Sequence, residues 1–358
     1  MRKHLAEMLL KDRFIGCILG GAVGDGMGYA VEGLAPLELE QYFENGKITE
    51  PYIDEVTGKL LISDDTQMAL FTMDGMMWAY IRCNNRGIGS YEASGVWQSY
   101  ARWYYTQTNI ILDEYIIHKH EHEPVVLSSI GVKTILEYEE LYSSRNPSEE
   151  SLLSLETLQM GTLEVPISGF KDASCLTRVA PVGLFLHDNP KEAFLVAARL
   201  AAITHGNPTG YLAAGAYACI LAEVLNEKNL DEAVRTALLE LEQYSYIDEV
   251  NDTLEYALHL SECDYNWEQG IELIGRTASA EDVLAMGVYC ALKAERFEEA
   301  VIWAANCGGL SSSAAFVAGS LAGAFLGDMS IPKEWKSRLE LKEMMLEWID
   351  KFYKLREF

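Results

Sequence analysis

Residues 60–78, LLISDDTQMALFTMDGMMW, contain two adjacent carboxylates, Asp64 and Asp65, between the hydroxyls of Ser63 and Thr66. Neighbouring carboxylates repel each other unless a cation or a proton lies between them. Oxygen ligands of this kind suit hard cations such as Mg²⁺, Mn²⁺ or Ca²⁺. The same residues also fit a helix N-cap, because the apolar residues that follow recur at three- and four-residue spacing. The sequence leaves both hypotheses open, a metal site and a helix cap.

Two glycine-rich stretches, residues 14–33 and 306–327, resemble each other in composition. The glycines of the first recur every four residues, at Gly16, Gly20, Gly24 and Gly28. On a helix this spacing makes a flat stripe that another helix can approach closely, so both stretches are expected at the centre of a bundle. The first also carries Asp25, and a buried acid is costly unless it is paired. Asp25 is therefore expected either to serve a site or to make local hydrogen bonds.

Other polar residues give weaker signals. Arg178 stands beside the small-residue loop 171–178 and could contact an anion or form a surface ion pair. His205, at the break between two Ala-rich segments, could be a ligand or a helix C-cap. Three alternating histidines, His118, His120 and His122, would share a face only in an extended segment. A solvated loop is the simpler explanation for them.

The composition restricts the classes of partner. The chain has 358 residues, 49% hydrophobic, with a net charge of −26. Such a surface repels nucleic acid and anionic membranes, and an anionic substrate would need a locally positive or metal-bearing pocket. The seven cysteines are scattered without a C-x-x-C pair, which favours a reducing cytoplasm. The N-terminus lacks the apolar core of a signal peptide, and no apolar run reaches the roughly 20 residues that span a bilayer.

Apolar periodicity predicts helices along most of the chain, and strand signals are nearly absent. The expected helices cover residues 4–13, 37–43, 66–86, 90–107, 190–204, 208–226, 230–244, 248–262, 266–274, 280–294, 297–306 and 334–356. The polar segment 143–164 is expected to be a flexible excursion. We therefore expect an all-α fold in one compact domain, residues 1–358.

Six motifs occur in order over nearly the whole chain. They are GGAVGDGMGYAVEG, ISDDTQMALF, SCLTRVAPVGLF, THGNP, AEDVLAMGVYCAL and AANCGGLSSSAAFVAGSLAGAFLG. Together they resemble the ADP-ribosylglycohydrolase family. The resemblance implies a single compact orthogonal helical bundle with two Mg²⁺ or Mn²⁺ ions in a central cleft. It also implies hydrolysis of the N- or O-glycosidic bond between ADP-ribose and a protein side chain, often arginine, or a small molecule.

The resemblance also implies roles for individual residues. The family's first metal-ligand set falls on Ser63, Asp64 and Asp65, with Ser63 where threonine is usual, and a further family acid falls on Glu32. Glu32, Asp64 and Asp65 are then the candidate catalytic residues. The candidate substrate-binding residues are Asp25, Ser174, Cys175, Arg178, His205, Gly308 and Gly309.

The chain departs from the family pattern at two places. The second ligand set, G-G-D-[ST]-D-[ST], reads here Gly308-Gly309-Leu310-Ser311-Ser312-Ser313, without either aspartate. We therefore expect at most one Mg²⁺ or Mn²⁺ ion, or none, with Ser311 or Ser313 as neutral ligands. In addition, Asp172-Ala173-Ser174-Cys175 stands where the family is usually glycine-rich, and Asp172 would oppose a diphosphate.

Three hypotheses follow. The first is a divergent cytoplasmic hydrolase of an ADP-ribosylated protein or small molecule. The second is a catalytically silent member that binds an ADP-ribose-like ligand or a protein partner. The third is a scaffold that has lost the ligand. None of them involves nucleic acid or a membrane.

Overall fold

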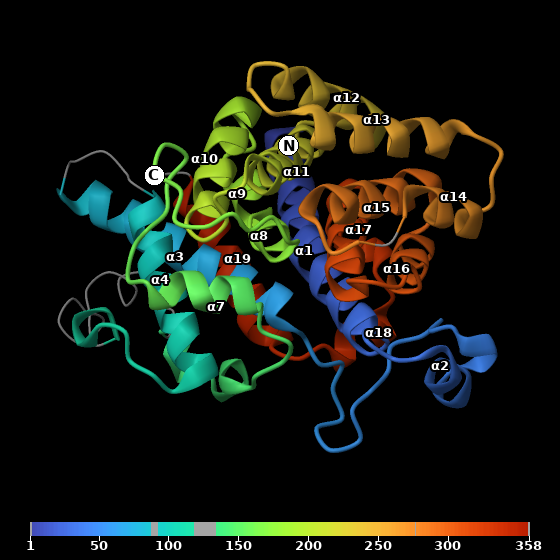
Figure 1. The fold of residues 1–358 in the computed structure, drawn as a ribbon, viewed down its shortest axis with the longest axis horizontal. Coiled ribbons are helices and arrows are strands. Elements are labelled where there is room, and N and C mark those ends of the chain that lie inside the picture. The colour runs from blue at the N-terminus through green and yellow to red at the C-terminus, as the bar shows by residue number, and fades with distance from the viewer. Residues whose placement is uncertain (1, 87–91, 118–133, 276, 357–358) are drawn as a thin grey trace.

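The computed structural model describes residues 2–86, 92–117, 134–275 and 277–356, in which helices are joined by loops (Figure 1). Within these ranges there is no extended strand, only two isolated bridges, Leu60 with Leu339 and Asp172 with Ser279. The expected all-α class is confirmed. The three alternating histidines at 118, 120 and 122 lie outside the described residues.

The helices follow the predicted segments closely. The α-helices are α1 (Arg2–Tyr29), α2 (Pro36–Tyr42), α3 (Asp64–Arg86), α4 (Glu92–Thr108), α7 (Glu149–Glu156), α8 (Ser174–Thr177), α9 (Ala180–Phe185), α10 (Pro190–Ala202), α11 (Pro208–Leu225), α12 (Leu230–Leu241), α13 (Asp248–Glu262), α14 (Trp267–Ile274), α15 (Ala280–Lys293), α16 (Phe297–Ala305), α17 (Ser311–Leu326), α18 (Lys333–Arg338) and α19 (Lys342–Leu355). Short 3₁₀ turns are η1 (Glu44–Gly46), η2 (Ile135–Glu137), η3 (Glu139–Tyr142) and η4 (Asp328–Ser330).

Two expectations were wrong. Residues 143–164 are not a loose excursion, because they contain α7, in which Ser151 and Leu155 are buried. The tail, expected as one helix, divides into α18 and α19. Leu341 at the break has a left-handed φ of 53°, and the turn directs Glu340 inward to Arg145.

Helices α1 and α17 lie antiparallel, side by side (Figure 1), and their backbones touch along the glycine stripe. A Cβ on Gly16 would lie 2.2 Å from the carbonyl oxygen of Gly323, and one on Gly20 would lie 2.4 Å from that of Gly319. A Cβ on Gly28 would lie 2.2 Å from the carbonyl oxygen of Ser311. The predicted close approach is confirmed, and it aligns the C-terminal end of α1 with the N-terminal end of α17.

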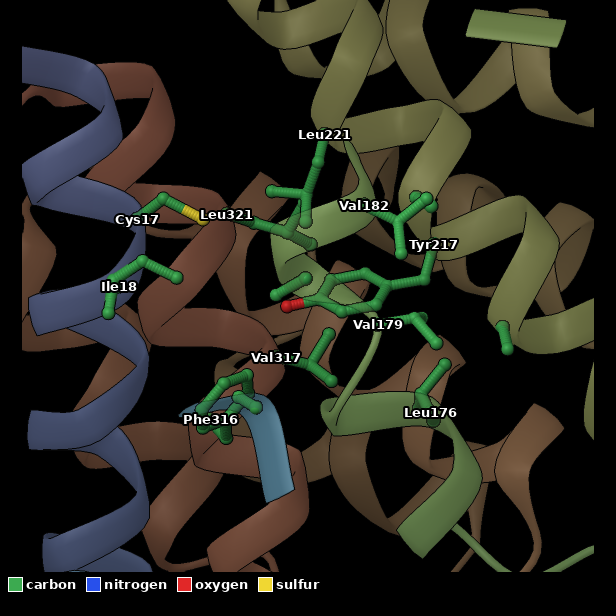
Figure 2. Close-up of a cluster of buried hydrophobic side chains, with 14 of the residues drawn as sticks. Cys17, Ile18, Leu176, Val179, Val182, Tyr217, Leu221, Phe316, Val317 and Leu321 are labelled. Atoms are coloured by element: carbon green, nitrogen blue, oxygen red, sulfur yellow. The ribbon is translucent and has the colours of Figure 1, made fainter. Parts of the chain in front are cut away.

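The core beside this pair is filled from α11, which runs past α17 and α9 (Figure 1). The ring of Tyr217 lies among Val179, Val182, Leu321 and Val317 (Figure 2) and is fully buried. In the described ranges, α11 is the one helix whose length and composition would allow it to cross a membrane, and 89% of it is buried inside the protein. Core helices of globular proteins commonly share these properties.

The glycine stripe yields a stability prediction. Gly20→Ala should destabilise the fold by about 1–3 kcal/mol, because the new methyl would overlap a backbone oxygen that cannot rotate away. This cost exceeds the roughly 1 kcal/mol that alanine gains over glycine in a helix. Gly169→Ala is the matched control, since a Cβ there meets nothing within 4 Å. Urea unfolding of both variants would test this, and equal stabilities would contradict the close packing.

Candidate functional site

The first turn of α3 is held by an acid from α1. The Asp25 carboxylate accepts hydrogen bonds from the backbone N–H of Ser63 (2.9 Å) and of Thr66 (3.2 Å). It also accepts from both hydroxyls, each at 2.5 Å. Asp25 is fully buried, so it positions α3, and its expected contact with substrate stays a prediction. The Ser63 hydroxyl oxygen also accepts from the backbone N–H of Asp65 at 3.2 Å, as the helix-cap hypothesis expects of this stretch.

The two adjacent acids of α3 point to different neighbours. Asp65 accepts from the Thr177 hydroxyl at 2.7 Å and from the Ser313 hydroxyl at 2.9 Å. Asp64 accepts from the backbone N–H of Ser148 at 3.1 Å. Both acids are less than a tenth exposed, at 3% and 8%. Asp65 thus connects α3 to α8 and α17, whereas Asp64 faces the segment before α7.

Glu32, just beyond α1, binds the first turn of α17. Its Oε2 accepts from the backbone N–H (2.9 Å) and the hydroxyl (2.6 Å) of Ser312. In return, the Ser311 hydroxyl donates to the Gly28 carbonyl at 3.1 Å. An acid at a helix N-terminus is favoured by the helix dipole. The end of α1 and the start of α17 therefore supply hydrogen-bond partners to each other. Leu310 instead lines a small cavity of mixed polarity with Val283, Met286 and Asp282.

Burial and like charge determine the protonation of these acids. Burial raises the pKa of Asp65 to about 8, and the charges of Asp25 and Glu32 add to this, against the hydroxyls of Thr177 and Ser313. Burial, and then the charge of Asp65, raise the pKa of Asp64. Burial also raises the pKa of Asp25 to about 6, against its four hydrogen bonds. Without a cation, these carboxyls retain protons at unusually high pH.

The donor chemistry does not fit a pair of divalent cations. In the described part of the chain, no three His, Cys, Asp or Glu side chains lie close enough together to hold a metal ion. Asp65 and Glu32 are already paired with serine hydroxyls, and the Ser63 hydroxyl, an expected ligand, donates to Asp25. The expectation of at most one Mg²⁺ or Mn²⁺ stays a prediction.

A second polar cluster surrounds α8. His205 Nε2 lies 2.6 Å from Asp172 Oδ2, and its Nδ1 lies 2.8 Å from the Thr204 hydroxyl. Burial lowers the pKa of His205 against the opposing charge of Asp172, so the imidazole is neutral. Burial alone would raise the pKa of Asp172, but hydrogen bonds from His205 and Ser174 lower it to about 2. Asp172 is therefore ionised, and His205 and Ser174 stabilise its charge by hydrogen bonds.

The remaining predicted site residues fall into two groups. Ser174 is 8% exposed and donates to the Ser148 hydroxyl at 3.0 Å, whereas His205 and Cys175 are fully buried. The backbone N–H of His205 donates to the Ala201 carbonyl at the end of α10 (3.0 Å), and a ligand role for its ring stays a prediction. Gly308 and Gly309 are exposed and have left-handed φ angles of 74° and 63°. They form the tight turn that leads into α17.

Arg178 lies in the core and not at the surface. It is fully buried, its guanidinium donates to the Ala201 carbonyl (3.1 Å) and the Thr204 hydroxyl (2.6 Å), and it lies over the Tyr100 ring. The expected surface ion pair was wrong, because neutral carbonyl and aromatic partners solvate its charge inside the core. The anion contact stays a prediction.

Sequence reasoning missed several residues that contact the acids. Thr177 lies inside a motif already singled out, but its bond to Asp65 spans 112 positions. Ser148 and Arg145 lie in the segment expected to be flexible. The Arg145 carbonyl accepts from the backbone N–H of Asp64 at 3.2 Å. The sequence signal available for them was the N-cap pattern of α7, which Ser148 begins.

Asp65 yields a pH prediction. Its folded-state pKa of about 8 exceeds the ordinary value of 3.8. An acid raised in this way favours folding fully below pH 3.8, and this contribution is lost as the pH rises toward 8. Asp65→Asn cannot ionise, so in EDTA it should gain more than about 1 kcal/mol over the wild type between pH 5 and pH 8. Urea unfolding at both pH values tests this, with exposed Asp252→Asn as control; parallel curves would contradict it.

Comparison with known proteins agrees with this fold. A family model described as ADP-ribosylglycohydrolase matches residues 6–357. An uncharacterized protein of Archaeoglobus fulgidus is 26% identical over 356 residues, covering 97% of both chains. A solved structure described as an ADP-ribosylglycohydrolase-related protein complex superposes with a TM-score of 0.64 at 21% identity, over 98% of this chain and 99% of that one. That similarity shows the fold, and the family match over nearly the whole sequence shows that the chain belongs to the ADP-ribosylglycohydrolase family.

Proposed function

We propose that this protein hydrolyses the N- or O-glycosidic bond that joins ADP-ribose to a protein side chain or a small molecule. Family membership supports a glycohydrolase-like function. The observation that carries the proposal is the convergence of acids at the first turn of α17. Glu32 binds Ser312, and Asp65 binds the next residue, Ser313. One carboxyl from the turn after α1 and one from the first turn of α3 therefore reach the same turn of α17, where they could act as acid and base in hydrolysis.

The environments of these two carboxyls suit different steps. In the hydrolysis, the hydroxyl of water adds to the anomeric carbon of the ribose, and a proton goes to the leaving nitrogen or oxygen. Asp65 is buried with a pKa of about 8, so it holds a proton at neutral pH and can donate it to the leaving group. Glu32 is only partly buried and can accept the proton from the attacking water. No step requires a second metal ion.

A hydrolysis assay tests the proposal. ADP-ribosylarginine and an ADP-ribosylserine peptide would be incubated with the protein in EDTA, Mg²⁺ or Mn²⁺. We expect release of ADP-ribose from one of them, and a loss of 100-fold or more in Asp65→Asn and in Glu32→Gln, as for removal of a general acid or base. Asp252→Asn, an exposed acid of α13, is the control. Full activity in both site variants would exclude the assigned roles.

A catalytically silent, ligand-binding protein is the second candidate. It is favoured by the neutral donors Thr177, Ser312 and Ser313, which satisfy Asp65 and Glu32 without a cation. Calorimetric titration with ADP-ribose, with and without Mg²⁺, separates the two. Metal-independent binding without turnover of either substrate supports the silent protein, whereas turnover excludes it.

Restoring the missing aspartates gives a metal-binding prediction. Leu310→Asp with Ser312→Asp would place a carboxylate against Glu32, and such a pair requires a cation or a proton. Mn²⁺ affinity should rise at least tenfold over the wild type in calorimetric titration. Ser312→Ala is the control, because it removes the hydroxyl without adding charge. Equal Mn²⁺ affinity in the restored variant would contradict the assignment of residues 308–313 as the altered ligand set.

We also propose, from the net charge of −26, that nucleic acid and anionic membranes are not partners. The single-domain organisation and the cytoplasmic location stay predictions.

A further inference from the structure

The site carries several acids, yet the proposed ligand contains a diphosphate, which needs a positive partner. Arg178, the cation expected from the sequence, is fully buried among carbonyls. Arg145 lies beside the acids instead. Its carbonyl accepts from the backbone N–H of Asp64 at 3.2 Å, and its guanidinium donates to the Ile62 carbonyl at 3.0 Å. Burial raises the pKa of the Tyr29 phenol. The charge of Arg145 lowers this pKa, and the charges of Asp25, Glu32 and Asp64 raise it.

Arg145 is paired with a carboxylate from the C-terminal part of the chain. Its Nη2 donates to Glu340 Oε1 at 2.8 Å and its Nη1 donates to Oε2, so the contact is bidentate. The two side chains are 11% and 6% exposed. A carboxylate in this arrangement presents the same pair of acceptor oxygens that a phosphate would present.

The residue that follows this carboxylate has a strained backbone conformation. Glu340 follows α18 and precedes Leu341, whose φ of 53° is unusual for a residue with a branched side chain. Such conformations persist where the surrounding structure imposes them, and they concentrate at functional positions. The break between α18 and α19 thus serves to bring Glu340 to Arg145.

Arg145 also lies within a strap, residues 143–148, that crosses the first turn of α3. Gln67 Nε2 donates to the Ser143 carbonyl at 3.0 Å at one end of the strap. The backbone N–H of Ser148 donates to Asp64 at the other end. The guanidinium is therefore attached to a backbone that is fixed to the acid site at both ends.

Glu340 has room to separate from Arg145. It lines a groove of about 490 Å³ between the 57–59 turn, η3 and the α18–α19 break. Two cations, Lys59 and Lys342, and two further acids, Glu140 and Glu343, line the same groove. A displaced Glu340 carboxylate would therefore enter an open groove of mixed charge.

We propose that Arg145 determines specificity for the diphosphate of ADP-ribose, exchanging Glu340 for two phosphate oxygens when the ligand binds. The inference rests on the proposed function, because it takes ADP-ribose as the ligand. It explains how a site without a second pair of aspartates, and hence without two cations, binds an anion. Glu340 then acts as a competitor that occupies Arg145 in the free protein.

Calorimetric titration with ADP-ribose tests the exchange, with adenosine as the matched ligand that lacks a diphosphate. Arg145→Gln should weaken ADP-ribose binding at least tenfold and leave adenosine binding unchanged. Glu340→Gln, which removes the competing charge but keeps the shape, should strengthen ADP-ribose binding at least threefold. A purely structural pair predicts the opposite for Glu340→Gln, because loosening the strap would weaken both ligands.

A double variant keeps the test informative if either single variant unfolds. Arg145→Gln with Glu340→Gln leaves no unpaired buried charge, and it should show the weak ADP-ribose binding of Arg145→Gln with normal adenosine binding. Wild-type ADP-ribose affinity in the double variant would overturn the role of Arg145 alone. Failure of the wild type to bind ADP-ribose would overturn both this inference and the proposed function.

Discussion

Direct backbone contact between α1 and α17 fixes the distance between the two halves of the site. Cβ atoms on Gly16, Gly20 or Gly28 would overlap carbonyl oxygens of the facing helix, so the two helices lie closer together than side chains would permit. With this spacing, Glu32 at the end of α1 reaches Ser312, and Ser313 reaches Asp65. The other helices, including α3 and α11, pack around α1 and α17. The distance between these two helices is short because the facing residues are glycines.

We propose that hydroxyl groups perform at this site the task that the family resemblance assigns to cations. Buried acids need a cation, a proton or hydrogen-bond donors. Here Thr177 and Ser313 donate to Asp65, and Ser312 donates to Glu32. A serine at position 312, where the pattern has aspartate, turns a repulsive acid pair into a hydrogen bond. The two changes in the ligand set therefore reinforce each other: the charges that required metal are absent, and neutral donors satisfy the acids that remain.

Much of the fold could be predicted from the sequence, because helix periodicity and the glycine stripe are local patterns. The family resemblance likewise predicted Glu32 and Asp65 as site residues, and the structure brings both to the first turn of α17. What could not be predicted depends on long-range contacts or on unusual backbone. Arg145 and Glu340 are 195 positions apart, and the break that joins them occurs at Leu341, where no glycine or asparagine marks a left-handed residue. The sequence offered an anion contact or a surface ion pair for Arg178 and not its burial, because a cation rarely lies in a core without an acid.

We propose that this site is built for fewer metal ions than the family pattern provides. Anomalous diffraction from crystals grown with saturating Mn²⁺ is the sharpest test, because it locates and counts the ions without reference to activity. We expect at most one manganese peak, beside the first turn of α3, with Ser312 still bonded to Glu32. Two fully occupied peaks, one of them next to residues 310–313, would contradict it.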